Sequence, residues 1–507
     1  MVSGGPTARV APSATIEQEA PLAYRAVRGG IWVTLSTWWV IGFGFAVNIV
    51  LTRLLAPEAF GVFSLAMFFA QVLRVQPRLG LGYAYGQYPC SDGQTLGTFV
   101  TMDLGAAAAG LALVAAAAPV LLSVGYDALT VRAALLLGAS VAVESVTATG
   151  IALLEKELRF GQVSVIQAVG FPLSYAPAVW LALRGGGVWS LVAQNTTYSV
   201  LCLIGVTAVL VAARSRLRRD GWRFSGGLAR HLLRFGAGVG LGLLGVTLLT
   251  QLDNLLVGSL MGVAVLGYYD RAYRTAQWPG TLLNGLIART GFYTYARLQD
   301  DAARLDRALR MMVWLIAALA LPVALAVFAA APDLLVLLYG ERWLPSAPYL
   351  RLLALAAGVR PLVDNANTLF AAVGKPWLAA RLNGIQVGVL ALAGLPLVWR
   401  FGAVGACLAV TLAASVGLFL VLRHLSAVAP GAAGELTVPA LAAAVALVGA
   451  LAVGVAPQVV ALGVALRVGL KAGCAVALFA LALVAARPRQ TRERLAYVWR
   501  LARPERG

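Results

Sequence analysis

The sequence predicts an all-α polytopic membrane protein with about fourteen transmembrane helices. Its 507 residues are 60% hydrophobic and 12% charged, with a mean hydropathy of +0.82. A soluble globular chain has about 45–50% apolar and about 25% charged residues. Apolar segments of about 18 residues or more recur along the chain, each long enough to cross a hydrocarbon layer roughly 30 Å thick. This composition excludes a soluble globular protein.

The predicted spans follow these apolar segments and are separated by short polar connections. They cover residues 31–52, 59–80, 99–123, 131–153, 163–183, 188–212, 235–260, 264–288, 311–331, 348–373, 378–399, 403–422, 437–456 and 458–486.

The basic residues support this count and its orientation. Of the 40 lysines and arginines, 29 fall in segments that would face the cytoplasm, 5 fall in segments that would face outward, and 6 lie within spans. Such an alternation with every crossing is what the positive-inside rule requires, and it places both termini in the cytoplasm. The net charge of +19 is then mostly a matter of topology, and a nucleic-acid partner is not needed to explain it.

An internal repeat indicates two related halves. With a constant offset of 206 residues, Asn48 aligns with Asn254, Gly61 with Gly267, and Ala66 with Ala272. Aromatic residues flank both glycines: Phe60 and Phe63 in the first copy, Tyr268 and Tyr269 in the second. In both copies a long apolar segment, a tight reversal and another apolar segment follow one another. We therefore predict two pseudo-symmetric six-helix lobes in tandem, with the cargo passing between them.

The spans and charges divide the chain into six parts. These are a cytoplasmic N-terminal tail (1–30), an N-terminal six-helix lobe (31–212), a basic cytoplasmic linker (213–234), a C-terminal six-helix lobe (235–424), two additional transmembrane helices (437–486) and a basic cytoplasmic tail (487–507). An amphipathic helix is predicted over residues 296–312, with Asp300/Arg304 and Asp306/Arg310 as pairs on its polar side. The longest outer connection, at about residues 332–347, is too short for a catalytic domain.

Several kinds of site are excluded or unsupported. The four cysteines show no paired spacing, and two histidines are too few for a histidine-built metal centre, so no metal or cofactor is predicted. A GxGxxG pattern begins at Gly240, but no strand precedes it, and close helix packing explains its glycines better. Gly374-Lys375 lacks the rest of a nucleotide-binding loop.

Ionisable residues within spans are the candidate functional residues, because each costs about 2.5–3.5 kcal/mol on insertion scales. We predict that Arg271, Arg274 and Arg360 bind an anionic substrate, since the guanidinium fork matches phosphate oxygens. Asp253 and Asp364 are candidates for ion coupling. The simpler interpretation is pairing, as Asp270/Arg274 and Arg360/Asp364 each have an i,i+4 spacing. Further ionisable residues within the predicted spans are Arg351, Arg467, Lys471, Asp103 and Glu144.

Four segments carry a resemblance to a known family: RLLAPEAFGVFSLA from Arg53, LDNLLVGSLMGVAVLGYYDRAYR from Leu252, YGERWLPSAPYLRLLAL from Tyr339 and FAAVGKPW from Phe370. In their order and spacing they resemble the polysaccharide-transporter, or Wzx-type flippase, family of the multidrug/oligosaccharidyl-lipid/polysaccharide exporter superfamily. The resemblance implies two six-helix lobes in a V-shaped arrangement, and alternating access driven by an ion gradient. It also implies a cavity lined by arginines, to which Arg271 and Arg274 would correspond.

The resemblance implies a transporter rather than an enzyme. Its expected substrate is an undecaprenyl-diphosphate-linked oligosaccharide, a unit of lipopolysaccharide, O-antigen or exopolysaccharide, carried across the bacterial inner membrane. Expected partners are this lipid-linked oligosaccharide, membrane lipid, and a glycan polymerase or export proteins, with no nucleic acid. Two alternatives stay open: a drug or cation antiporter of the same architecture, and, less favoured, a membrane glycan polymerase or ligase.

Overall fold

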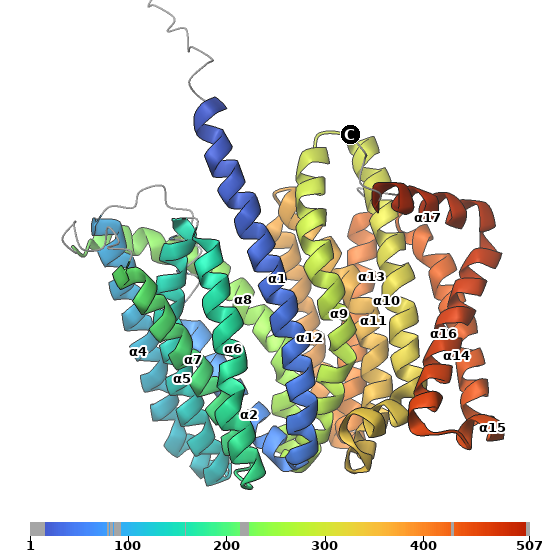
Figure 1. The fold of residues 1–507 in the computed structure, drawn as a ribbon, viewed down its shortest axis with the longest axis horizontal. Coiled ribbons are helices and arrows are strands. Elements are labelled where there is room, and N and C mark those ends of the chain that lie inside the picture. The colour runs from blue at the N-terminus through green and yellow to red at the C-terminus, as the bar shows by residue number, and fades with distance from the viewer. Residues whose placement is uncertain are drawn as a thin grey trace, which may run out of the picture. The chain divides into compact units, whose positions relative to one another are not determined.

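The computed structural model describes residues 16–78, 81, 85, 93–157, 159–212, 223–426 and 430–502. Within these residues the chain consists of helices and short connections, with no strand (Figure 1). The prediction of an all-α protein is confirmed.

The helices alternate with tight turns. In the first half they are α1 (Ile16–Leu54), α2 (Pro57–Arg78), α4 (Gly93–Ser123), α5 (Ala128–Lys156), α6 (Phe160–Leu183) and α7 (Val188–Ala212). In the second half they are α8 (Gly226–Met261), α9 (Val263–Leu298), α10 (Ala302–Tyr339), α11 (Ala347–Ala372), α12 (Pro376–Phe401) and α13 (Ala403–Leu425). The chain ends with α14 (Thr437–Val455), α15 (Pro457–Val460), α16 (Val464–Ala486) and α17 (Pro488–Ala502), and two 3₁₀ segments lie at η2 (Glu341–Ser346) and η3 (Ala433–Leu436).

The structure differs locally from the sequence prediction at three places. The first helix begins at Ile16, earlier than predicted. Helix α10 continues through Pro332 to Tyr339, so most of the predicted 332–347 loop is helical. The predicted 296–312 helix is broken after Leu298, because Asp301 caps α10 by accepting a hydrogen bond from the Arg304 backbone N–H at 3.0 Å.

Hydropathy separates the helices into two groups. Eleven helices in the described residues are long and apolar enough to cross a membrane, so the protein is a multi-pass membrane protein. Helices α2, α9 and α11, also predicted as spans, are not among the eleven. Helices α9 and α11 are long enough, but Asp270, Arg271, Arg274, Arg360 and Asp364 lower their hydropathy.

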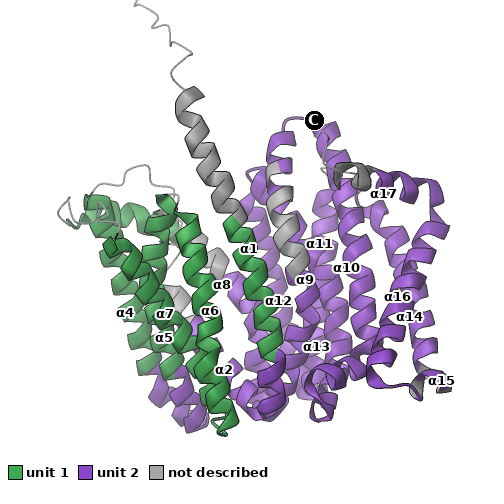
Figure 2. Cartoon of the chain, in the orientation of Figure 1, with its two compact units in different colours: residues 1–48, 76–115, 135–240 green, residues 49–75, 116–134, 241–507 purple. Residues whose placement is uncertain are grey.

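The chain forms two compact units (Figure 2). Unit 1 contains Met1–Asn48, Gln76–Ala115 and Leu135–Gly240; unit 2 contains Ile49–Val75, Ala116–Ala134 and Leu241–Gly507. Two pieces of the first half therefore pack with the second half. Within unit 1, α6 packs along α7; within unit 2, α11 packs against α9, α10 and α13, while α14 and α16 pack against each other and against α10.

Inside unit 2, the two copies of the internal repeat meet through their glycines. A side chain on Gly61 of α2 would overlap the carbonyl oxygen of Val263 at the start of α9, and one on Gly267 of α9 would overlap that of Pro57 at the start of α2. Gly61 and Gly267 are 206 residues apart, and so are Pro57 and Val263. The contact is thus reciprocal, and only glycine lets the two backbones come so close.

Other contacts follow the same reciprocal pattern. Arg53, at the end of α1, donates hydrogen bonds to the carbonyls of Leu337 and Leu338 near the end of α10, at 2.6 and 2.8 Å. Its repeat equivalent, Ser259, lies 2.6 Å from the hydroxyl of Tyr126, just beyond the end of α4. The last turn of the first helix in each copy therefore binds the end of the third helix in the other copy.

Trp343 of η2 fills the centre of this region. It is fully buried, its indole N–H donates to the Thr52 carbonyl at 3.0 Å, and the rings of Phe60, Tyr268 and Tyr339 surround it at 5.6 to 6.0 Å. Phe60 and Tyr268 are aromatic residues that flank the two glycines. Offset and edge-on aromatic contacts of this kind contribute about 0.5–1.5 kcal/mol each beyond burial.

The close contact at Gly61 and Gly267 predicts that one added methyl group at either position destabilises the protein. Replacing Gly61 or Gly267 with alanine forces α2 and α9 apart, because each new side chain meets a backbone carbonyl that cannot rotate away. We expect a loss of about 1–3 kcal/mol for each variant, as for overpacked sites generally. Thermal unfolding of the detergent-solubilised protein measures this loss. Gly388→Ala, where the added atom has open space, is the control; unfolding of all three variants at one temperature would contradict the prediction.

Candidate functional site

A pocket opens within unit 2 among α8, α9, α11, α12 and α13. The space between its walls, counted out to its open mouth and including solvent there, is about 700 Å³. Most of its lining is apolar, with a few polar groups that could orient a ligand. It is lined by Leu249, Tyr273, Ala276, Gln277, Gly280, Thr281, Leu353, Ala356, Ala357, Arg360, Pro361, Gln386, Leu390, Val410, Ala413 and Ala414.

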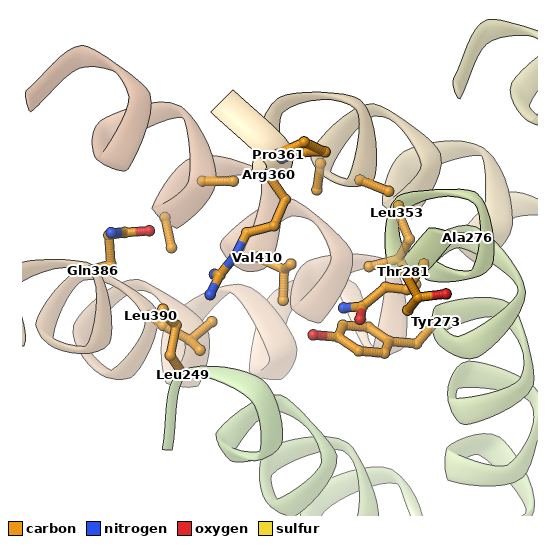
Figure 3. Close-up of a pocket in the computed structure, with 16 residues that line it drawn as sticks. Leu249, Tyr273, Ala276, Thr281, Leu353, Arg360, Pro361, Gln386, Leu390 and Val410 are labelled. Carbon is orange, nitrogen blue, oxygen red and sulfur yellow. The ribbon is translucent and has the colours of Figure 1, made fainter. Parts of the chain in front are cut away.

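Arg360 is the charged residue in this lining. Figure 3 shows its side chain reaching from its helix into the space between Leu390 and Tyr273. Its Nε donates to Asp364 Oδ1 at 3.1 Å, one turn further along α11, so the predicted i,i+4 pair is confirmed. Its two terminal nitrogens make no hydrogen bond to a described residue, and 29% of the side chain is exposed. Arg360 therefore presents an available hydrogen-bonding fork to the pocket.

Arg271 has a different environment from Arg360. Its side chain is 5% exposed and donates from Nη2 to Asp270 Oδ2 at 2.8 Å. The guanidinium also lies 4.2 Å from the centre of the Phe60 ring, a cation–π contact. Arg271 is not among the residues that line the pocket. In this structure it binds a carboxylate at the contact between α2 and α9.

Arg274 shares that carboxylate but is more accessible. Its Nε donates to both oxygens of Asp270, at 3.0 and 2.9 Å, and 44% of its side chain is exposed. The predicted Asp270/Arg274 pair is confirmed, whereas the sequence did not predict that Arg271 binds Asp270 as well. The Ser64 hydroxyl donates to Asp270 Oδ1 at 3.1 Å, and Ser64 is the repeat equivalent of Asp270.

Asp253 is buried on α8 next to the pocket. Its side chain accepts a hydrogen bond from the Tyr269 hydroxyl at 2.5 Å, and it forms no salt bridge with a described residue. The residues one turn away on the two helices, Leu249 and Tyr273, line the pocket. The rings of Tyr269 and Tyr273 are 6.1 Å apart, with 30° between their planes. The tyrosine that binds Asp253 therefore stacks on a tyrosine that lines the pocket.

The sequence analysis missed the neutral polar residues of the site, because it considered only charged residues within spans. Tyr273, Gln277 and Thr281 follow one another at i,i+4 spacing on α9, and this stripe was a signal that could have identified the pocket-facing side. Gln386 is a buried amide on α12, and its amide nitrogen donates to the Asn383 side-chain oxygen at 3.3 Å.

Two acidic residues within the helices of unit 1 accept hydrogen bonds from hydroxyl groups. Asp103 of α4 is buried and accepts a hydrogen bond from Thr149 of α5, and Glu144 of α5 accepts one from Ser199 of α7 at 3.1 Å. These contacts join neighbouring helices of unit 1 and are not part of the pocket described above. No cluster of three or more potential metal ligands occurs among the residues that the structure describes.

Comparison with known proteins identifies relatives of the chain. A succinoglycan biosynthesis transport protein, ExoT, of Rhizobium meliloti is 27% identical over 65% of this chain and 65% of its own length. A lipopolysaccharide biosynthesis protein, WzxC, of Escherichia coli is 24% identical over 71% of this chain and 73% of its own. The matched segment thus spans a little under two thirds of the first relative.

Solved structures share the fold. The lipid II flippase MurJ, in an inward closed conformation, superposes with a TM-score of 0.69 at 13% identity, covering 90% of this chain and 99% of MurJ. An inward-facing multidrug resistance MATE family transporter superposes with a TM-score of 0.60 at 16% identity, covering 76% of this chain and 94% of the transporter. These similarities show a common multi-helix fold.

The family model described as polysaccharide biosynthesis protein matches residues 50–348, more than half of the chain. This match includes the glycine contact and the lining residues contributed by α8 and α9. It confirms the resemblance to polysaccharide transporters found in the sequence. The chain belongs to the polysaccharide biosynthesis protein family.

Proposed function

We propose that this protein is a flippase that moves polyprenyl-diphosphate-linked oligosaccharide across the bacterial inner membrane by alternating access. Two relatives support the proposal through their names, one a transport protein of succinoglycan biosynthesis and one a protein of lipopolysaccharide biosynthesis. One solved structure with the same fold is that of a lipid II flippase. Both termini would lie in the cytoplasm, as the distribution of basic residues predicts. A glycan polymerase and export proteins are the proposed partners.

The chemistry of such a substrate explains why a protein is required. A sugar head group with a diphosphate would lose its hydrogen bonds to water in hydrocarbon, at a cost of several kcal/mol for each polar group. The protein must supply replacement partners at membrane depth. Tyr273, Gln277 and Thr281 offer hydroxyl and amide groups along one wall of the pocket.

The single observation that carries the proposal is the available fork of Arg360 in this pocket. A guanidinium can bind two phosphate oxygens at once and stays charged when it is partly dehydrated. Arg274, which is half-exposed, is the second proposed anion ligand. Arg271, also proposed from the sequence, would need to leave Asp270 to touch substrate, so in the conformation described here its geometry favours an indirect role: it helps hold the carboxylate that orients Arg274.

Asp253 is the proposed carrier of the coupling ion, with a proton as the simplest choice. A carboxyl group buried without a cation is stable in a low-dielectric interior chiefly when it is neutral. Tyr269, which donates to Asp253, stacks on Tyr273 in the pocket wall, so Asp253 lies close to the pocket. One charge moved through 100 mV supplies about 2.3 kcal/mol. Asp364, whose carboxylate binds Arg360 one turn away in the pocket wall, is the alternative carrier.

A drug or cation antiporter is the second candidate, supported by the shared fold with a multidrug transporter. The pocket disfavours it, because the charged group in the lining is an arginine that repels an organic cation. A polymerase or ligase is disfavoured as well, since η2 and the turns beside it are small for a catalytic domain.

Arg360→Gln should weaken transport. Removing a charged hydrogen bond costs about 1.5–3 kcal/mol, so we expect uptake of a defined undecaprenyl-diphosphate-linked oligosaccharide into proteoliposomes to fall roughly 10- to 100-fold. Arg360→Lys should recover part of the activity, because it keeps the charge and loses the fork. Arg400→Gln, at the exposed end of α12, is the matched control. Full transport by Arg360→Gln at equal protein content would refute the assignment.

Asp253→Asn should separate binding from coupling. The amide preserves the size of the side chain but cannot release a proton, so we expect transport driven by a pH gradient to fall at least about tenfold while substrate binding changes little. Substrate binding to the solubilised protein and gradient-driven flux in proteoliposomes measure the two quantities. Asp300→Asn, at an exposed position outside the pocket, is the control. If the gradient still accelerates flux in Asp253→Asn, Asp364 becomes the candidate.

A further inference from the structure

Three charged residues meet where α16 packs against α10. Lys471 donates to Asp333 Oδ2 at 2.7 Å, and Arg467 Nη1 lies 3.3 Å from Asp333 Oδ1. The side chain of Asp333 is 8% exposed and that of Lys471 is 12% exposed. Arg467 and Lys471 lie one turn apart on α16, and Asp333 is the anion between them. The group holds two positive charges and one negative charge.

The surplus positive charge has no nearby counterpart along the C-terminal helices. The sequence contains no Asp or Glu between Glu435 and Glu493. Lys471 holds the shorter contact to Asp333, and its side chain also passes Gly454 in the last turn of α14. The C-terminal end of a helix carries a partial negative charge and favours a cation. Lys471 is thus compensated, and the surplus charge belongs to Arg467.

Arg467 has unused hydrogen-bonding capacity. Its Nε is buried and has no hydrogen-bond partner among the described residues. Its contact with Asp333 is longer than that of Lys471, and 26% of its side chain is exposed. The neighbouring Leu466 and Leu470 are 55% and 42% exposed, as expected of a helix that faces lipid. An unpaired buried N–H on a charged group is unfavourable unless a ligand completes it.

The cluster lies near the ends of both helices, where lipid phosphates are expected. Arg467 lies three residues into α16, or about 5 Å from its beginning, and Asp333 lies six residues before the end of α10, or about 9 Å from it. Arginine side chains near helix ends extend toward the membrane interface. A phosphate at this level can accept hydrogen bonds from the guanidinium edge that Asp333 leaves open.

We propose that Arg467, held in place by Asp333 and supported by Lys471, binds the phosphate of an anionic phospholipid at the surface formed by α10 and α16. The site is separate from the pocket around Arg360 and does not depend on the proposed transport function. On the topology proposed above, it faces the outer leaflet. The ligand is a phospholipid with a net negative charge, because the protein supplies one uncompensated positive charge.

The test compares lipid retention by the purified full-length protein. The protein is incubated in mixed micelles containing equal amounts of phosphatidylglycerol and phosphatidylcholine, and bound lipid is counted by native mass spectrometry. We expect the unmodified protein and the control variant Arg400→Gln to retain phosphatidylglycerol preferentially. Arg400 lies at the end of α12 and has no carboxylate partner among the described residues. Arg467→Gln should reduce that preference at least fivefold, or about 1 kcal/mol. An unchanged preference in Arg467→Gln overturns the proposal, as does equal retention of both lipids by the unmodified protein.

A second variant distinguishes a lipid site from a purely structural ion pair. Asp333→Asn raises the net charge of the cluster, so a lipid site should retain more phosphatidylglycerol than the unmodified protein does. A purely structural pair predicts a lower unfolding temperature with no gain in bound lipid, and that result contradicts the proposal. A third arm adds undecaprenyl phosphate as a competitor. Its selective binding over phosphatidylglycerol would show a site for the carrier lipid and would also overturn the assignment.

Discussion

The reciprocal approach of α2 and α9 is the contact on which the rest of unit 2 depends. Gly61 and Gly267 bring two backbones together so closely that no side chain fits between them. This closeness places Ser64, Phe60 and Thr52 around Asp270 and Arg271, which gives a buried ion pair the partners it needs. A buried pair is strongly destabilising when one partner is lost. The backbone contact and the ion pair therefore stabilise each other.

On helix α9, the charged residues that join helices are separate from the polar residues that face the pocket. The Asp270 end of α9 is used for packing, and the stripe that begins at Tyr273 faces the pocket. Helix α11 shows a similar division: Asn365 accepts a hydrogen bond from Tyr295 at 3.0 Å, whereas Arg360 extends into open space. The polar residues that lower the hydropathy of these helices thus divide into those that join helices and those that are available to a ligand.

Much of the fold could be predicted from the sequence, because span length, charge alternation and the spacing of repeats are local properties. The Arg360/Asp364 and Asp306/Arg310 pairs were predicted for the same reason, since i,i+4 spacing places both groups on one helix face. The role of Arg271 was not predictable, as its partners Thr52 and Phe60 are far away in the chain. Asp333 was assigned to the connection 332–347, because the predicted span ended at residue 331, yet α10 continues through Pro332. The role of Arg271 and the helical position of Asp333 both depend on tertiary packing.

The hydrogen bond of the Trp343 indole determines when this region can form during synthesis. The carbonyl that it binds belongs to Thr52, 291 residues earlier. Arg53 likewise donates hydrogen bonds to carbonyls that are more than 280 residues downstream. While a ribosome is still adding the second half, the end of α1 lacks these partners. This early segment must remain in the bilayer without its second-half partners until the later helices have been inserted. This region is therefore completed late in synthesis.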